Sequence, residues 1–280
     1  MRLSAFNISN FKVDGGAMFG VIPKALWCKL YEADANNNIT LALRSLVVET
    51  GGHIILIDAG WGDKQDEKFF RYSYLHGGEG LIGGLKSCGY TPEDITDVVL
   101  THLHADHCGG CFHNAPEGGT EPLFPNAKYY ISKAQWEWAN ESNLREEDAF
   151  LTENIKPFEE SGKLILVNEG DVFWPDIDLR IFYGHTPGLI VPLINYNGKT
   201  FVYTGDLIPT MAHIPLLWNM AYDLLPLVTI AEKEAMLQEA LDNNYILLFQ
   251  HDVLRECCTL VKREKGIRAD REGLFSDYLL

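Results

Sequence analysis

The chain has 280 residues, of which 46% are hydrophobic, a length and composition that allow one large globular core. Its 39 acidic and 23 basic residues give a formal charge of −16 at pH 7, and a surface this negative repels nucleic acid and anionic membranes. The first residues lack the apolar run of a secretion signal, and no later apolar run could span a bilayer. We therefore expect a cytoplasmic protein with a single domain over residues 1–280 and no membrane or nucleic-acid partner.

From residue 43 onward, aliphatic and β-branched runs bounded by glycine, proline and asparagine predict an α/β fold of short strands and helices. In chain order we expect strands at 43–49 and 54–58, a helix at 81–88, strands at 97–101 and 128–131, a helix from Ser132, strands at 163–167, 179–183, 190–196 and 200–204, a helix from 229 to about 243, and a strand at 245–249. The Asn197-Gly198 pair predicts a tight hairpin turn. Thr229 and Glu232 match a capping box at the start of the last helix.

A cluster of metal-binding side chains follows the strand that ends near Thr101. Four such side chains fall within six residues, namely His102, His104, Asp106 and His107. Imidazole and carboxylate groups together suit zinc, iron, manganese or cobalt. Ordinary surface histidines are a poor explanation, because three of the nine histidines in the chain fall in this one short run. The run therefore predicts part of a metal site.

Three further candidate ligands each stand just after a predicted strand. His185 lies in a turn shaped by glycine and proline, Asp206 follows the hairpin, and His251 follows the last strand. Taken singly, each could be an ordinary loop residue with a hydrogen bond. Because strand ends hold loops rigidly around a site, their shared placement favours a common metal centre.

The six cysteines are too few and too scattered for a disulfide scaffold. Cys108 and Cys111 form a C-x-x-C pair, which could bind metal or act in redox chemistry. The chain has no second pair to complete a four-thiolate site. We therefore expect free, buried or half-buried thiols.

The H-x-H-x-D-H run at residues 102–107, followed by His185, Asp206 and His251, resembles the metallo-β-lactamase superfamily of binuclear metallohydrolases. Asp58, Ala59 and Gly60 match a D-x-G turn of that family, and the resemblance covers roughly residues 43–251. It implies a four-layer αβ/βα sandwich with the metals at the rim between two sheets.

The resemblance also implies a role for each candidate residue. One metal would be bound by His102, His104 and His185, a second by Asp106, His107 and His251, and Asp206 would bridge them. Asp106 and Asp206 are the carboxylates expected to take part in catalysis, and Asp58 would orient a histidine ligand. We expect two divalent ions, with zinc favoured over iron, manganese or cobalt. Such a pair can acidify a shared water for the hydrolysis of an ester-like bond.

Residues 15–24 and 205–213 look most like the lactonase and methyl parathion hydrolase branch of that superfamily, which implies a small neutral substrate and a homodimer. These segments and the residues after them could supply a substrate pocket built from Met18, Phe19, Met211, His213 and Trp218. Ordinary packing in the core explains the apolar residues among them equally well. One departure concerns a tyrosine that the lactonases carry three residues after the bridging aspartate. Pro209 stands there and has no donor, so His213 is a candidate replacement.

Two other functions remain open at this stage. A metal-dependent nuclease of the tRNA-processing branch would need a basic arm, and the short run at residues 262–265 is interrupted by an acid. A mononuclear iron oxidoreductase of the same fold, or a non-catalytic relic, would need fewer ligands than the seven present. The complete set favours the binuclear hydrolase.

Overall fold

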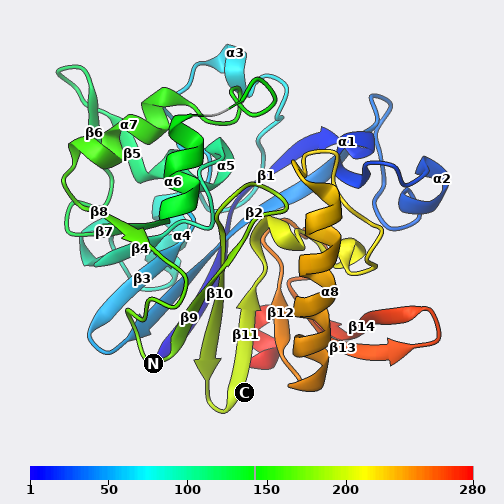
Figure 1. The fold of residues 1–280 in the computed structure, drawn as a ribbon. Helices are drawn as coiled ribbons and strands as arrows, with labels where there is room; N and C mark the ends of the chain where they lie inside the picture. The colour runs from blue at the N-terminus through cyan, green and yellow to red at the C-terminus, as the bar shows by residue number, and fades with distance from the viewer. Residues whose placement is uncertain (142, 280) are drawn as a thin grey trace.

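The computed structural model describes residues 1–141 and 143–279 and contains two six-stranded sheets (Figure 1). The first sheet has the order β1-β2-β3-β4-β7-β8, with β1 (Arg2–Asp14), β2 (Asn38–Thr50), β3 (His53–Ile57), β4 (Asp97–Val99), β7 (Lys128–Ser132) and β8 (Leu164–Val167). Its first three strands are antiparallel, and the strands from β3 to β8 run parallel.

The second sheet has the order β14-β13-β12-β11-β10-β9 and is antiparallel except between β11 and β12. Its strands are β9 (Ile177–Phe182), β10 (Leu189–Tyr196), β11 (Lys199–Tyr203), β12 (Ile246–Leu248), β13 (Cys257–Arg263) and β14 (Gly266–Gly273). A small separate hairpin pairs β5 (Phe112–Asn114) with β6 (Thr120–Pro122).

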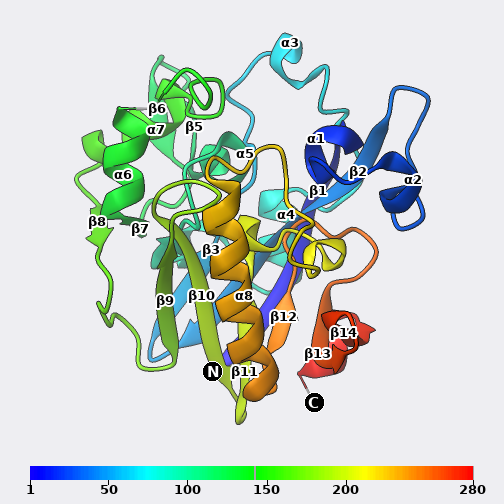
Figure 2. The same cartoon turned by 45° about the vertical axis from the view of Figure 1, so that its right-hand side comes forward.

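The structure describes eight α-helices, some of which cover the outer faces of the sheets. They are α1 (Gly15–Phe19), α2 (Lys24–Trp27), α3 (Glu67–Phe70), α4 (Leu81–Ser87), α5 (Ala105–Cys108), α6 (Lys133–Asn140), α7 (Thr152–Glu160) and α8 (Pro226–Asp242). The 3-10 turns are η1 (Pro92–Asp94), η2 (Gly109–Cys111), η3 (Gly205–Leu207), η4 (Met211–His213) and η5 (Phe275–Tyr278). Figures 1 and 2 show α6 and α7 beside the first sheet and α8 across the second. Among the described residues, no helix is long and apolar enough to cross a membrane.

The layers follow from the alternation of side chains along the strands. On β3, Ile55 and Ile57 point into a buried cluster between the sheets, whereas Leu56 packs in the cluster on the helical side. On the second sheet, Val202 and Leu247 face Leu237 of α8. Both faces of each central strand are therefore buried, and the expected αβ/βα sandwich is confirmed.

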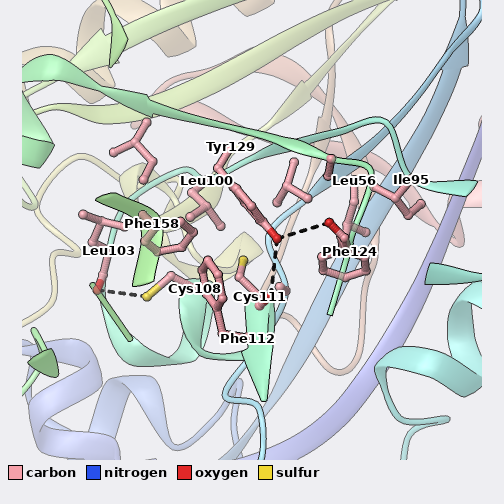
Figure 3. Close-up of a cluster of buried hydrophobic side chains, with 14 of the residues drawn as sticks. Leu56, Ile95, Leu100, Leu103, Cys108, Cys111, Phe112, Phe124, Tyr129 and Phe158 are labelled. Atoms are coloured by element: carbon pink, nitrogen blue, oxygen red, sulfur yellow. Dashed lines mark hydrogen bonds between the residues drawn. The ribbon is translucent and has the colours of Figure 1, made fainter. Parts of the chain in front are cut away.

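Figure 3 shows the cluster between the first sheet and its helices, which contains the C-x-x-C pair. Both thiols are free and buried, and Cys108 Sγ donates to the backbone oxygen of Leu103 at 3.3 Å. Burial raises the pKa of the Cys108 thiol to about 12. Because a thiolate is the form that binds metal and attacks disulfides, this pair is a packing element, as expected.

The predicted strands and helices lie within a few residues of those observed, with one correction at α8. The helix begins at Pro226, so Thr229 lies inside it and caps nothing. The Glu232 carboxylate instead accepts hydrogen bonds from the backbone amides of Tyr183 and Gly184. The capping-box prediction was wrong because a tertiary contact claims the carboxylate.

Candidate metal centre

The candidate ligands meet at one end of the two sheets, in the segments that follow four of the strands. The short helix α5 presents Asp106 and His107 directly after the loop that follows β4. His185 lies between β9 and β10, Asp206 follows β11, and His251 follows β12. Donor atoms lie within 4.8 Å of one another in three overlapping groups: His102, His104 and His185; His102, His107 and Asp206; and Asp106, His107 and His251. The structure thus brings together all seven residues that the sequence predicts.

The Asp206 carboxylate lies between these groups. Its Oδ2 atom is 3.2 Å from Nε2 of His185. Its Oδ1 atom is 3.0 Å from Nε2 of His251 and 3.7 Å from Nε2 of His107. One carboxylate therefore faces histidines of both expected metal sites, which is the geometry that a bridging ligand requires.

Each histidine turns one ring nitrogen inward and the other toward an acceptor. His251 Nδ1 is 2.8 Å from the Ala42 carbonyl oxygen, and His102 Nδ1 is 3.1 Å from Thr101 Oγ1. His107 Nδ1 is 3.0 Å from Asp58 Oδ2. These acceptors favour a proton on the outer nitrogen, which leaves the lone pair of the inner nitrogen directed at the centre.

Asp58 is fully buried directly after β3 and adopts a left-handed backbone conformation, with φ of 57°. Its carboxylate accepts from both the amide and the hydroxyl of Thr101, each at 2.8 Å. These two bonds fix the carboxylate against His107. Asp58 therefore lies where an orienting carboxylate is expected, and its effect on metal binding stays a prediction.

Two further carboxylates serve the remaining histidines and were missed from the sequence. Asp223 Oδ1 is 3.0 Å from His185 Nδ1, and Glu146 Oε1 is 3.5 Å from His104 Nε2. Both acids are buried, with exposures of 3% and 5%. They lie in irregular segments outside the ligand motif, and no local pattern distinguishes them from surface acids.

The charges in the cluster are strongly coupled. Burial, reinforced by the neighbouring histidines, holds the pKa of His102 well below its usual value. Burial would lower the pKa of His107 as well, but the carboxylates of Asp106, Asp206 and Asp58 raise it to about 10. In the protein alone these acids draw a proton onto His107, at the position where a cation would balance them.

A sequence profile described as the metallo-beta-lactamase superfamily matches residues 44–251, most of the chain. The chain belongs to this superfamily. It is 33% identical to a probable metal-dependent hydrolase from Staphylococcus aureus, whose structure superposes with a TM-score of 0.88 over 98% of this chain and 96% of that one.

Two lactonases are also similar to this superfamily member, one in sequence and one in fold. An N-acyl homoserine lactonase from a Bacillus species is 28% identical over 178 residues, which cover 58% of this chain and 64% of the relative. The match thus spans less than two thirds of that curated relative. AidC, a dizinc quorum-quenching lactonase solved with the product N-hexanoyl-L-homoserine, has a TM-score of 0.81 at 21% identity and covers 98% of this chain and 95% of its own. At that identity it shows a common fold.

In this member of the superfamily, a pocket of about 550 Å³ opens onto the metal-binding cluster. One wall is apolar and comes from β1, β2 and neighbouring segments: Phe11, Val13, Met18, Leu41, Trp61, Phe69 and Met220. The lining also includes Arg145 and Tyr222, which carry hydrogen-bond donors. The pocket therefore combines an apolar surface with a few polar groups close to the cluster.

The pocket predicted from the sequence needs correction at four of its five residues. Met18 lines the observed pocket, but Phe19 is fully buried and stacks on the ring of His213. Met211 and Trp218 border a different surface groove. Neighbouring residues of the short helix α1 point in different directions, so Met18 faces the cluster and Phe19 faces the core.

His213 is not available as the donor that would replace the missing tyrosine. Its Nδ1 atom is 2.7 Å from Thr210 Oγ1, and its Nε2 atom is 2.9 Å from the Met18 carbonyl oxygen. With both nitrogens occupied and 1% of the residue exposed, it ties η4 to α1. Tyr222 and Ser73 are the residues that bring hydroxyl groups to the pocket lining, and Tyr222 is exposed, with no hydrogen bond within the described part of the chain.

Proposed function

We propose that the protein is a hydrolase that binds two divalent metal ions and acts on a small, neutral, ester-like substrate. The observation that carries the proposal is the orientation of the histidine lone pairs toward a shared carboxylate, Asp206. Membership of the metallo-beta-lactamase superfamily and the likeness to a probable metal-dependent hydrolase support it.

The residues fit such ions by their chemistry. Nε2 of His107 is buried and has no hydrogen-bond partner among the described residues, a cost that a bound cation would remove. Five histidines and two aspartates, without a thiolate, are donors that suit zinc. His102, His104 and His185 would hold one ion, and Asp106, His107 and His251 the other, with Asp206 shared.

Two such ions, when bound, acidify a water molecule and polarise the carbonyl or phosphoryl group under attack. The chain itself supplies orientation. Asp58 and Asp223 fix the rings of His107 and His185 by accepting from the outer nitrogens. Glu146 faces the outer nitrogen of His104 at 3.5 Å. The apolar wall binds the hydrocarbon part of the substrate and excludes water. Tyr222 and Arg145, which also line the pocket, can donate to a substrate oxygen.

The substrate class follows from the pocket and the charge. The volume of the pocket, about 550 Å³, suits a lactone, an aryl ester or a phosphotriester. The similarity to N-acyl homoserine lactonases favours lactones. A long polyanion would face a chain with a charge of −16, so we place the nuclease alternative second. The homodimer and the cytoplasmic location stay predictions, the first to be checked by light scattering.

Elemental analysis of the purified protein tests the metal assignment. We expect close to two transition-metal ions per chain after incubation with zinc, cobalt or manganese. One ion or fewer under all three conditions would overturn the binuclear assignment.

The substrate assignment is tested by comparing kcat/KM for a neutral lactone, an aryl ester and a phosphotriester with cleavage of a tRNA precursor at low salt. We expect turnover of at least one neutral substrate and none of the RNA. Efficient RNA cleavage without turnover of any neutral substrate would favour the nuclease instead.

A further inference from the structure

The helix α8 carries a buried lysine, Lys233, which does not line the substrate pocket. Lys233 is 1% exposed, and its ammonium nitrogen lies 2.9 Å from the Trp218 carbonyl oxygen and 3.1 Å from Asn219 Oδ1. The carbonyl oxygens of Pro215 and Leu216 follow at 3.4 Å each. Lysine is almost never this buried without partners, and here the four acceptors come from one short segment.

That segment, residues 214–225, has no helix or strand of its own. Its carbonyl groups therefore lack the partners that a regular ladder provides, and a buried carbonyl without a partner is costly. No backbone donor is recorded for the carbonyl oxygens of Leu216 or Trp218 within the described residues. The Lys233 ammonium is thus the group that holds this part of the chain in its bent course.

The same segment leads directly into the candidate active site. Met220, Ala221 and Tyr222 line the pocket, and Asp223 accepts from His185 Nδ1 at 3.0 Å. A displacement of residues 215–219 would therefore move both the pocket wall and a carboxylate that orients a metal-binding histidine.

The helix also binds the backbone directly before His185. Glu232, next to Lys233 in sequence, accepts from the amides of Tyr183 and Gly184 at 2.7 and 2.9 Å. The packing is tight, because a Cβ atom on Gly184 would lie 2.3 Å from the backbone nitrogen of Thr229. Two consecutive side chains of α8 thus fix the two segments that meet at His185.

We propose that Lys233 is a positioning residue for this site: from outside the pocket, its ammonium holds residues 215–219 so that Met220–Tyr222 form the pocket wall and Asp223 reaches His185. The part that concerns turnover rests on the proposed hydrolase function. Methionine at this position would match the length of the lysine stem and avoid the burial of a charge, which lowers the pKa of Lys233 to about 7. A role in packing alone would therefore be served better by an apolar side chain.

Lys233→Met tests the proposal, with Lys262→Met, at an exposed lysine, as the matched control. In the metal-free protein we expect amide hydrogen exchange over residues 218–224 to accelerate at least tenfold in Lys233→Met and to stay unchanged in the control. In the zinc-loaded enzyme we expect KM to rise about tenfold. A smaller folded fraction would lower kcat alone and leave KM as it was, so the KM separates positioning from general stability. A folded variant with unchanged exchange, or with unchanged KM, overturns the proposal.

A double-mutant cycle with Asp223→Asn tests whether Lys233 affects zinc affinity through Asp223. If Lys233 acts through Asp223, the combined loss of zinc affinity should be smaller than the product of the two single losses. Fully multiplicative losses contradict this route.

Should Lys233→Met fail to fold, Asn219→Ala removes one acceptor and should raise exchange over residues 220–224 about threefold. If the wild-type enzyme turns over no substrate, the proposed hydrolase function fails, while exchange and zinc affinity still decide the role of Lys233.

Discussion

Asp58→Asn should weaken metal binding although the residue touches no metal in the arrangement proposed. The Asp58 carboxylate accepts three hydrogen bonds, two from Thr101 and one from His107 Nδ1. An asparagine keeps one oxygen for the Thr101 amide and turns an NH₂ group toward the imidazole. His107 Nδ1 must then act as an acceptor, so the proton moves to Nε2, the nitrogen that faces Asp106 and Asp206.

The size of the effect follows from the loss of one orienting partner. Such losses reduce metal affinity by roughly 10- to 100-fold, or about 1.4–2.7 kcal/mol. The metal-free protein should lose about 1–3 kcal/mol of unfolding free energy, because the buried Thr101 hydroxyl no longer has the carboxylate oxygen that accepts its hydrogen bond. Competition with a chromogenic zinc chelator measures the first quantity, and urea unfolding of the metal-free protein measures the second.

Asp97→Asn provides a matched control. Asp97 is also buried at the start of β4, and its carboxylate accepts from Thr96 Oγ1 and Tyr130 OH and lies 2.7 Å from His53 Nδ1. It is at the end of the strand opposite His102, so its replacement should reduce stability and leave zinc affinity within twofold of the wild type. Folded Asp58→Asn protein with wild-type zinc affinity would refute the reasoning.

Three further outcomes are expected. Asp206→Ala should lower kcat by more than roughly 100-fold, the upper limit for the loss of an orienting partner. It should also lower kcat more than the loss of any one histidine. Near-normal turnover in a metal-loaded variant would mean that another residue bridges the ions. Tyr222→Phe should lower kcat/KM by roughly 10-fold with metal content unchanged, if its hydroxyl donates to the substrate. Burial lowers the pKa of His213 to about 3, so the unfolded chain takes up its proton first as the pH falls below 6.5. Between pH 6.5 and 5 the metal-free wild type should therefore lose about 2 kcal/mol more unfolding free energy than His213→Gln, and equal slopes in urea unfolding would contradict this.

The sheet strands were predictable where apolar runs were bounded by clear turns, as at Asn197-Gly198, whose residues have φ of 50° and 74°. The N-terminal strand β1 was not. Its pairing with β2 is interrupted between Asn7 and Asn10, and Asn7 Oδ1 accepts from the Leu43 amide. Two asparagines in an alternating run indicate a loop when the partner strand is unknown. These asparagines belong to a strand because of their pairing with β2, including the Leu43 amide that donates to Asn7.

The candidate ligands were predictable because four of them share one short run and the others follow strands. Their orienting acids were predictable to different degrees. Asp58 belongs to a motif that follows a strand. Asp223 and Glu146 lie in irregular segments, where an acid that faces a histidine and an acid that faces water look alike in sequence. Glu232 illustrates the same limit. Its spacing from Thr229 matches a helix cap, but in the structure its carboxylate accepts from the amides of Tyr183 and Gly184.

Hydrogen bonding separates the candidate ligands from the other buried histidine in a way that sequence cannot. His213 has a protein partner at each ring nitrogen, so it has no lone pair to offer a cation. His107 has Asp58 at Nδ1 and no hydrogen-bond partner at Nε2 among the described residues, although both residues are buried. Because a buried nitrogen without a partner is costly, an arrangement that leaves one open at the centre of a charged cluster favours a bound cation. The same criterion removes His213 from the site, where its position after Asp206 in sequence had suggested it.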